Sequence, residues 1–341
     1  MKKRWIVGIV IVIAAFSIIL FPFYRLLTKT LKISPIRTLL SWDSIRKVNS
    51  QTNILILGIA GGTHEGPNLS DSIVVANYDF NENKIISLGI PRDIWSPTLQ
   101  DKVNSAYAYG EAKQNGGGLK LAKAEVSAIT GMPIQYSVVI NFKGFEDLIN
   151  YLGGIDVVVE RSFTDKKYPI EGKEDDTCGV DKEFLCRYET ISFNKGSMHM
   201  DGNTALKFVR SRNSIGTEGS DFARSQRQQK VFTAVKEKVT QVVRSLNTGK
   251  IEELYKHVDP IISRDMTNQQ AAIIAKKIVF GKNFRQENYV LPRDFFIVPA
   301  VDQYSGQYAL VPKKGDYTII HQYSACIFAA VYKRDCDFLI D

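Results

Sequence analysis

Residues 53–90 decide the fold of this chain and read NILILGIAGGTHEGPNLSDSIVVANYDFNENKIISLGI. Three segments within them, at 54–57, 72–78 and 84–90, are rich in isoleucine and valine and are bounded by glycine, asparagine or proline. Buried or half-buried strands have this composition. The polar residues 81–83 between the second and third segments predict a hairpin. The stretch therefore predicts strands of one sheet.

Helical and strand-like segments alternate downstream of this stretch. The helical ones are residues 106–113, 119–129 and 142–152, and the strand-like ones are 135–140 and 155–159. Strands and helices in alternation are typical of helices packed on a central sheet. We therefore predict an α/β domain whose central mixed β-sheet is flanked by helices.

The chain divides into five regions by composition. We expect a cytoplasmic tail at 1–4, a transmembrane anchor at 5–24, a juxtamembrane linker at 25–52, a catalytic domain at 53–246 with a charged insertion at 161–190, and a C-terminal α+β extension at 247–341. The extension holds helical segments near 251–257 and 268–279 and short strands from Tyr289 onward.

The N-terminal region predicts the anchor. Residues 5–24 contain no charged side chain and follow Lys2, Lys3 and Arg4. About 20 helical residues at about 1.5 Å each just cross a bilayer core. A cleavable signal peptide is the alternative, but the apolar run is long for one and no small-residue cleavage site follows it. The basic residues place the N-terminus in the cytoplasm and the main domain outside the cell membrane, which the chain crosses once.

The charge of the chain limits its partners. The 341 residues carry a net charge of +8, with 44% hydrophobic and 23% charged residues. Nucleic acid, an anionic lipid surface and phosphorylated substrates all attract a basic chain. The sequence contains no zinc finger, RNP1 segment or helix-turn-helix, so we expect a membrane and a phosphorylated substrate, and no nucleic acid.

The four cysteines lie in two near pairs, Cys178 with Cys186 and Cys326 with Cys336. In an oxidising compartment this spacing favours two local disulfides, and free thiols are the alternative. The four histidines show no metal-binding or nucleophile-partner spacing, so we assign them no catalytic role.

A dense group of arginines lies at residues 208–229, FVRSRNSIGTEGSDFARSQRQQ. Arg210, Arg212, Arg224 and Arg227 surround a glycine-containing loop. Guanidinium groups are planar, charged forks that fit phosphate oxygens two at a time. A helix is predicted after Asp221, and one stripe of it carries Arg224, Gln228, Val231, Val235, Val239 and Val242. Because the stripe begins polar and ends apolar, it predicts a semi-buried anion pocket; a solvated helix face is the alternative.

Several motifs follow one another in an order that resembles the LytR-CpsA-Psr family of cell-wall phosphotransferases. They are NILILG, SDSIVV, SLGIPRD, VNSAYAYG, FKGFEDLINYLGGIDVVV, KGSMHMDGNTALKFVRSR and SDFARSQRQQ, and they span residues 53–243. The resemblance implies a bacterial membrane enzyme that takes a glycan from a polyprenyl diphosphate carrier. It implies transfer of that glycan, with one phosphate, to a wall acceptor such as peptidoglycan.

The resemblance also implies roles for single residues. The diphosphate binders would be Arg92, Arg210, Arg212, Arg224 and Gln228. Asp71 would be a carboxylate on the magnesium side, and Asp93 and Asp221 would lie beside the same site. We expect Arg92, Asp93, Arg210 and Arg212 to be catalytic and Asp71 and Asp221 to face the metal. Asp93 could instead orient Arg92 through an ion pair.

The chain departs from the family at Ala60, where an acidic residue is usual after the first strand. Mg²⁺ is therefore expected with one fewer carboxylate, or with His64 or Glu65 as a replacement. A non-catalytic module that binds lipid diphosphate or cell wall is an alternative that the missing acid favours. A transcriptional regulator is a further alternative, for which an extracytoplasmic domain without a DNA-reading motif is poorly suited.

Overall fold

The computed structural model describes residues 5, 17–18, 20–40, 45–61, 66–170, 172–173, 176–179, 181–281, 283–329 and 336, without the side chains of Asp221 and Phe222. Within these residues, no helix has both the length and the apolar character needed to cross a bilayer. Most of the predicted anchor at 5–24 lies outside them.

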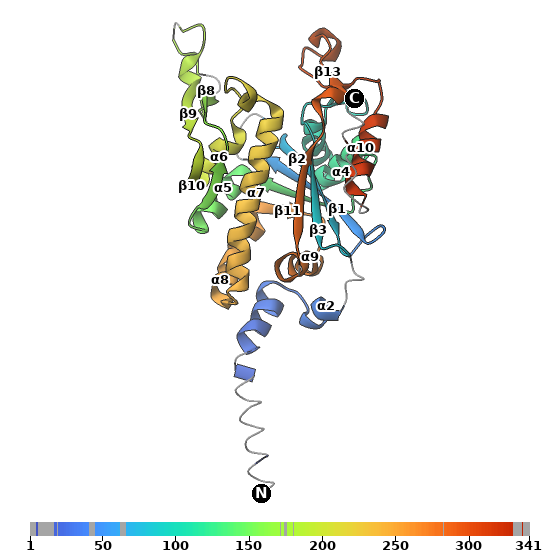
Figure 1. Cartoon of the computed structure of the whole chain (residues 1–341), viewed down its shortest axis with the longest axis vertical. Coiled ribbons are helices and arrows are strands. Elements are labelled where there is room, and N and C mark those ends of the chain that lie inside the picture. Colours follow the sequence, from blue (N-terminus) through green and yellow to red (C-terminus); the bar gives the residue numbers. More distant parts are fainter. Residues whose placement is uncertain are drawn as a thin grey trace.

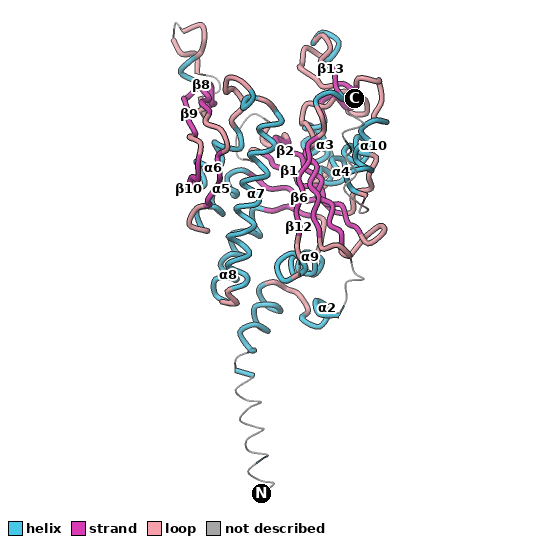
Figure 2. The backbone as a smooth tube through the Cα atoms, in the orientation of Figure 1, coloured by secondary structure: helices cyan, strands magenta, loops and turns pink. Residues whose placement is uncertain are grey.

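A six-stranded mixed sheet forms the centre of the molecule (Figures 1 and 2). Its strand order is β11 (Ile262–Arg264), β6 (Tyr136–Asn141), β1 (Gln51–Ile59), β2 (Ser70–Asp79), β3 (Lys84–Gly89) and β12 (Arg285–Val290). β1 pairs with β2 in antiparallel and with β6 in parallel orientation. β2 and β3 form the predicted hairpin, with Asp79 opposite Lys84. The predicted α/β fold with a central mixed sheet flanked by helices is confirmed.

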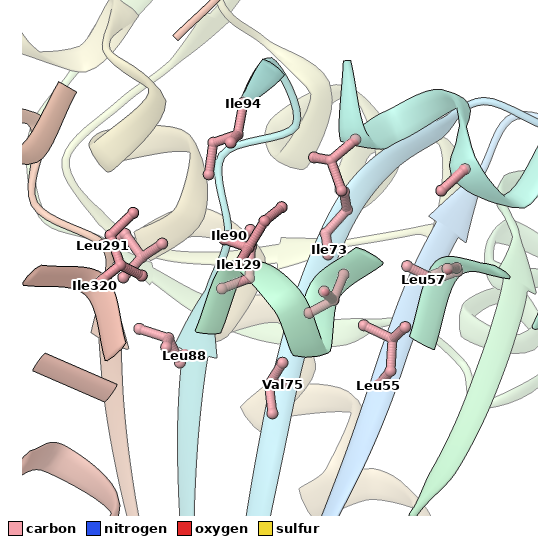
Figure 3. Close-up of a cluster of buried hydrophobic side chains, with 14 of the residues drawn as sticks. Leu55, Leu57, Ile73, Val75, Leu88, Ile90, Ile94, Ile129, Leu291 and Ile320 are labelled. Carbon is pink, nitrogen blue, oxygen red and sulfur yellow. The ribbon is translucent and has the colours of Figure 1, made fainter. Parts of the chain in front are cut away.

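One face of the sheet carries the main hydrophobic core. Side chains alternate along β1, β2 and β3, and one face contributes large aliphatic residues to this core: Leu55, Leu57, Ile73, Val75 and Leu88, with Ile90 just after β3 (Figure 3). Helices α3 (Ala106–Lys113), α4 (Gly117–Thr130) and α10 (Thr318–Phe328) contribute the rest of this core. The face is closed to water.

The other face is covered by helices α5 (Phe142–Tyr151), α7 (Asp221–Arg244) and α9 (Asn268–Phe280). α7 matches the predicted helix. Near α9, Ala76, Tyr78 and Ile85 of the sheet pack with Ile273 and Ile274 of the helix. A separate core joins α5, α6 (Gly202–Arg210) and α7 to the strands β7 (Ile155–Val159) and β10 (Gly196–Met200).

The charged segment 161–190 is only partly a surface insertion. It forms β8 (Phe163–Pro169), which pairs in antiparallel orientation with β9 (Tyr188–Phe193). The predicted Cys178–Cys186 disulfide is formed within it. At its base, Phe163, Asp165 and Tyr168 are buried, so this part belongs to the body of the domain.

The residues expected to form a C-terminal extension complete the central sheet. β11 and β12 are its two edge strands, and helix α8 (Thr248–Val258) lies against α5. The two-stranded pair of β13 (Phe296–Ile297) and β14 (Val311–Pro312) and helix α10 follow. The predicted Cys326–Cys336 disulfide is present. A boundary at 246 therefore does not separate two cores.

The segment that we expected to be a juxtamembrane linker packs onto the domain. It forms a π-helical turn at Leu26–Thr30 and the helix α2 (Pro35–Leu40). Leu26 and Ile33 are buried. Asn268 of α9 donates a hydrogen bond of 2.9 Å to the backbone oxygen of Leu31.

Candidate active site

A cavity of about 280 Å³ lies between the sheet and helices α5 and α7. It exists because the helix-covered face of the sheet carries small residues there, namely Gly58, Ser72, Ser87 and Gly89. Gly58 lies opposite Ser72 in the β1–β2 register. A Cβ atom at Gly58 would lie 3.2 Å from Cβ of Ser72 and 3.4 Å from the Phe142 ring, so a larger residue there would crowd this side of the cavity.

The cavity has both cationic and apolar walls. Its predicted polar residues come from four places in the fold: Asp71, Arg92, Arg210, Arg212, Arg224 and Gln228. Its apolar residues include Val74, Ile140, Phe142, Phe145, Val209, Val231 and Phe232. Such a cavity fits a ligand that joins an anionic group to a hydrocarbon chain.

Arg92 is held by two carboxylates. Its Nη1 donates to Oδ1 of Asp71, and its Nε lies 3.6 Å from Oδ2 of Asp93. Nζ of Lys102 lies 3.3 Å from the other oxygen of Asp93. Asp71 lines the cavity, whereas Asp93 is not among its lining residues. The geometry therefore matches the alternative in which Asp93 orients Arg92.

Arg210 and Arg212, which with Ser211 form the RSR turn, face the cavity from the end of α6. The guanidinium carbon of Arg210 lies 5.0 Å from the centre of the Phe142 ring. Among the described residues, no carboxylate forms an ion pair with Arg210 or Arg212. Their charges are therefore available to a ligand.

The first turns of α7 bring two more predicted residues to the cavity. Ser220 caps the helix, since its hydroxyl accepts a hydrogen bond from the Ala223 N–H. Arg224 is buried, and Oε1 of Gln228 accepts a hydrogen bond of 3.0 Å from the hydroxyl of Ser72. Gln228 is thereby fixed against the sheet. Asp221 begins the helix, and its side chain, like residues 62–65, lies outside the described part of the chain.

Asp165 of β8 holds the turn that carries Arg212. Its side chain is fully buried, and Oδ2 accepts hydrogen bonds from the hydroxyl of Ser211 at 2.8 Å and from the backbone N–H groups of Arg212 and Asn213 at 3.1 Å. A carboxylate that accepts several N–H and O–H bonds fixes the backbone that donates them. The sequence gives no signal for this role, because Asp165 lies in a charged segment far from the turn.

Arg227 supports the same turn from the other side and does not line the cavity. Its guanidinium donates to the backbone oxygens of Phe208 at 3.0 Å, Ser211 at 2.6 Å and Glu218 at 2.9 Å. It also stacks over the Phe163 ring at 4.6 Å. Burial lowers the pKa of Arg227, and the Glu218 carboxylate opposes this effect. This arginine of the cluster is therefore structural.

The chain matches the family model described as the LytR_cpsA_psr family over residues 29–309. The chain belongs to this family. The match confirms the resemblance noted in the motifs, and it includes β11, β12 and much of the segment that follows them.

Two curated relatives are named as transferases. Polyisoprenyl-teichoic acid–peptidoglycan teichoic acid transferase TagU of Bacillus mycoides (strain KBAB4) is 28% identical over 249 residues, which cover 69% of this chain and 71% of the relative. The TagV transferase of the same description from Bacillus subtilis (strain 168) is 30% identical over 202 residues, which cover 59% of this chain and 47% of that protein.

Solved structures share the fold. The crystal structure of B. subtilis TagV superposes with a TM-score of 0.57 at 22% identity and covers 83% of this chain and 98% of that one. A structure described as TagT bound to LI-WTA gives a TM-score of 0.55 at 22% identity and covers 87% and 99%.

Proposed function

We propose that this chain is a membrane-anchored, extracytoplasmic phosphotransferase. It moves a glycan with one phosphate from a polyprenyl diphosphate carrier to a cell-wall acceptor such as peptidoglycan. Family membership and the names of the relatives support this reaction class. The observation that carries the proposal is a cavity in which four arginines meet an apolar wall.

The cavity suits both halves of the carrier. The diphosphate would lie among Arg92, Arg210, Arg212 and Arg224, and the polyprenyl chain would lie against α5, α7 and the small residues of the sheet. Arginines fixed in advance stabilise the charge that develops on phosphate oxygens. Gln228 would donate a further hydrogen bond from its amide nitrogen, since its oxygen is engaged by Ser72.

The reaction is a substitution at phosphorus. An acceptor hydroxyl oxygen forms a bond to the phosphorus that carries the glycan, and the bond from that phosphorus to the bridging oxygen breaks. Polyprenyl monophosphate leaves with the bonding electron pair and can take up the hydroxyl proton. The negative charge on the leaving phosphate is met by the arginines of the cavity.

Mg²⁺ is part of the proposal. Asp71 is the one carboxylate among the described side chains that lines the cavity, and Mg²⁺ needs few protein carboxylates when phosphate oxygens and waters complete its shell. Asp71 therefore fits a magnesium ion that arrives with the diphosphate. The ion would add positive charge beside the phosphates, and Asp221 would be a second ligand.

Placement outside the cell follows from the predicted anchor at 5–24 and the basic residues before it. Two disulfides are compatible with an oxidising compartment. A protease-protection map of intact cells tests this topology, and a cytoplasmic main domain would reopen the regulator alternative.

Replacement of the RSR arginines tests the transferase itself. We expect Arg210→Ala and Arg212→Ala to lower transfer from a polyprenyl diphosphate glycan by about 100- to 1,000-fold while the protein stays folded, because a positioned donor stabilises the transition state by about that much. Lysine should rescue poorly, since it lacks the planar fork.

The matched control is Arg285→Ala. Arg285 is an exposed arginine at the start of the edge strand β12, and it forms an ion pair with Glu82. This variant should transfer like wild type. Near wild-type turnover in both RSR variants would show that the cluster is a solvated surface. Tight carrier binding without any transfer by the wild-type protein would instead support the non-catalytic binding module.

A further inference from the structure

The short helix α2 exposes a row of large aliphatic side chains. Ile36, Leu39 and Leu40 are 70%, 75% and 70% exposed. Residues separated by three and four positions share one face of a helix, so these three side chains form a single apolar stripe. Among the described residues, none covers this stripe, and its side chains face solvent.

The polar side of α2 faces the protein. The Thr38 hydroxyl accepts a hydrogen bond of 2.7 Å from Gln269, and the Thr38 backbone oxygen accepts one of 3.3 Å from Lys276. Gln269 in turn accepts a bond of 2.8 Å from the Ser34 N–H. A surface helix of a water-soluble domain normally turns its apolar stripe inward. α2 instead turns its polar side toward α9 and its apolar stripe away from the protein. This orientation suits a non-aqueous neighbour.

The surroundings of α2 are basic. Residues 25–40 include Arg25, Lys29, Lys32 and Arg37 and no acidic residue. Figure 1 shows α2 beside α9, at the end of the molecule opposite β13. The same segment begins directly after the apolar residues 5–24. Basic residues beside an apolar helix face are typical of helices that lie in the headgroup region of anionic bilayers.

We propose that α2 lies in the interface of the anionic membrane, with Ile36, Leu39 and Leu40 inserted among the lipids. This inference rests on the membrane attachment proposed above and goes beyond the transfer reaction. A second copy of the chain is a poorer occupant, since pairing two α2 faces would bring their basic residues together. Because Leu26, Ile33 and Thr38 are packed on the domain, the inserted helix would hold the domain in one orientation above the bilayer.

Photo-crosslinking to lipid tests the proposal. The full chain is reconstituted in vesicles of phosphatidylcholine and phosphatidylglycerol in equal parts, doped with a diazirine-bearing phospholipid, and the labelled tryptic peptides are identified by mass spectrometry. Residues 33–37 and 38–46 should carry label. The comparison surface is peptide 294–313, which contains the exposed residues Ile297, Val298 and Val301, and it should carry little label.

Two variants sharpen the result. Ile36→Ser/Leu39→Ser/Leu40→Ser should lose most of the label at α2, whereas Ile297→Ser/Val298→Ser/Val301→Ser should keep it. Label at α2 no higher than at 294–313, or protein–protein crosslinks between α2 segments, would overturn the proposal. Peptide 5–25 distinguishes the proposed membrane anchor from the proposed interfacial helix. If this peptide is labelled and α2 is not, the anchor is supported and the interfacial position of α2 is wrong. A transfer assay on the same samples reports the enzyme independently.

Discussion

At the scale of single residues, the ion pair of Asp71 with Arg92 bears directly on the proposed magnesium site. Both side chains line the cavity, and Arg92 donates directly to the carboxylate. If Asp71 holds the proposed magnesium ion, that ion would compete with this guanidinium for the oxygens of Asp71. A bound diphosphate would give Arg92 another partner, and the carboxylate would become available. Metal and diphosphate should therefore bind cooperatively.

Titration calorimetry tests this coupling. We expect the free protein to bind Mg²⁺ weakly and to bind it more tightly in the presence of a short-chain polyprenyl diphosphate. Asp71→Ala should remove the difference. Ala60→Asp, which restores the acid usual in the family, should strengthen metal binding without ligand. Tight magnesium binding by the unliganded wild-type protein that is unchanged in Asp71→Ala would contradict this coupling. It would indicate His64 or Glu65 as the metal ligand instead.

Some site residues could be predicted from sequence because local structure fixes them. Arg210 is the last residue of one helix and Arg212 follows it by two positions, and Arg224 and Gln228 lie in the first turns of the next helix. This spacing predicts that the four residues lie together. Asp165 could not be predicted in the same way. Its function depends entirely on a contact with a turn that lies 46 to 48 residues further along the chain.

At the scale of elements, the turn between α6 and α7 combines local and remote control. Asp201 caps α6 by accepting from the Thr204 N–H at 2.8 Å, and Ser220 caps α7. These caps set where the helices begin and are visible in the sequence. The path of the chain between the helices is instead set by Asp165 and Arg227, which bond its backbone from two sides.

Removal of the Asp165 carboxylate tests this control. In Asp165→Ala, the N–H groups of Arg212 and Asn213 and the Ser211 hydroxyl lose their acceptor. We expect the free energy of unfolding to fall by about 1–3 kcal/mol. We also expect weaker diphosphate binding, because Arg212 loses its fixed position. Urea unfolding and calorimetry with the short-chain diphosphate measure the two effects.

Asp181→Ala is the matched control, since that carboxylate also accepts two backbone N–H bonds but lies at the tip of the same insertion. It should leave diphosphate binding unchanged. Asp165→Asn keeps an acceptor oxygen and should lie between wild type and Asp165→Ala. If Asp165→Ala binds the diphosphate as well as Asp181→Ala does, the turn does not depend on Asp165.

At the scale of the whole molecule, the N-terminal and C-terminal parts build one sheet. β12 pairs in parallel with β3, and β11 pairs with β6. Leu310 bonds both the backbone oxygen of Asp93 and the N–H of Trp95, so the C-terminal part also holds the turn that carries Arg92. The sequence could not reveal this, because Ile262–Arg264 is too short to be predicted as a strand and RQENYV of β12 is too polar.

Truncation decides whether the C-terminal part is an extension or a necessary half of the fold. A chain that ends at Leu246 would lose both edge strands and core residues such as Leu291, Phe295 and Ile320. It would expose the backbone of β3 and β6 as open edges and leave the main core incomplete. We therefore expect no cooperative thermal transition and no near-ultraviolet circular dichroism signal from packed aromatic rings. The comparison is a chain that ends at Ala329, which retains every described strand and loses the Cys326–Cys336 disulfide and the buried Cys336. It should unfold cooperatively, with a free energy of unfolding lower by about 2–4 kcal/mol. Cooperative unfolding of the shorter chain near the temperature of the full one would show that residues after 246 are dispensable for the fold.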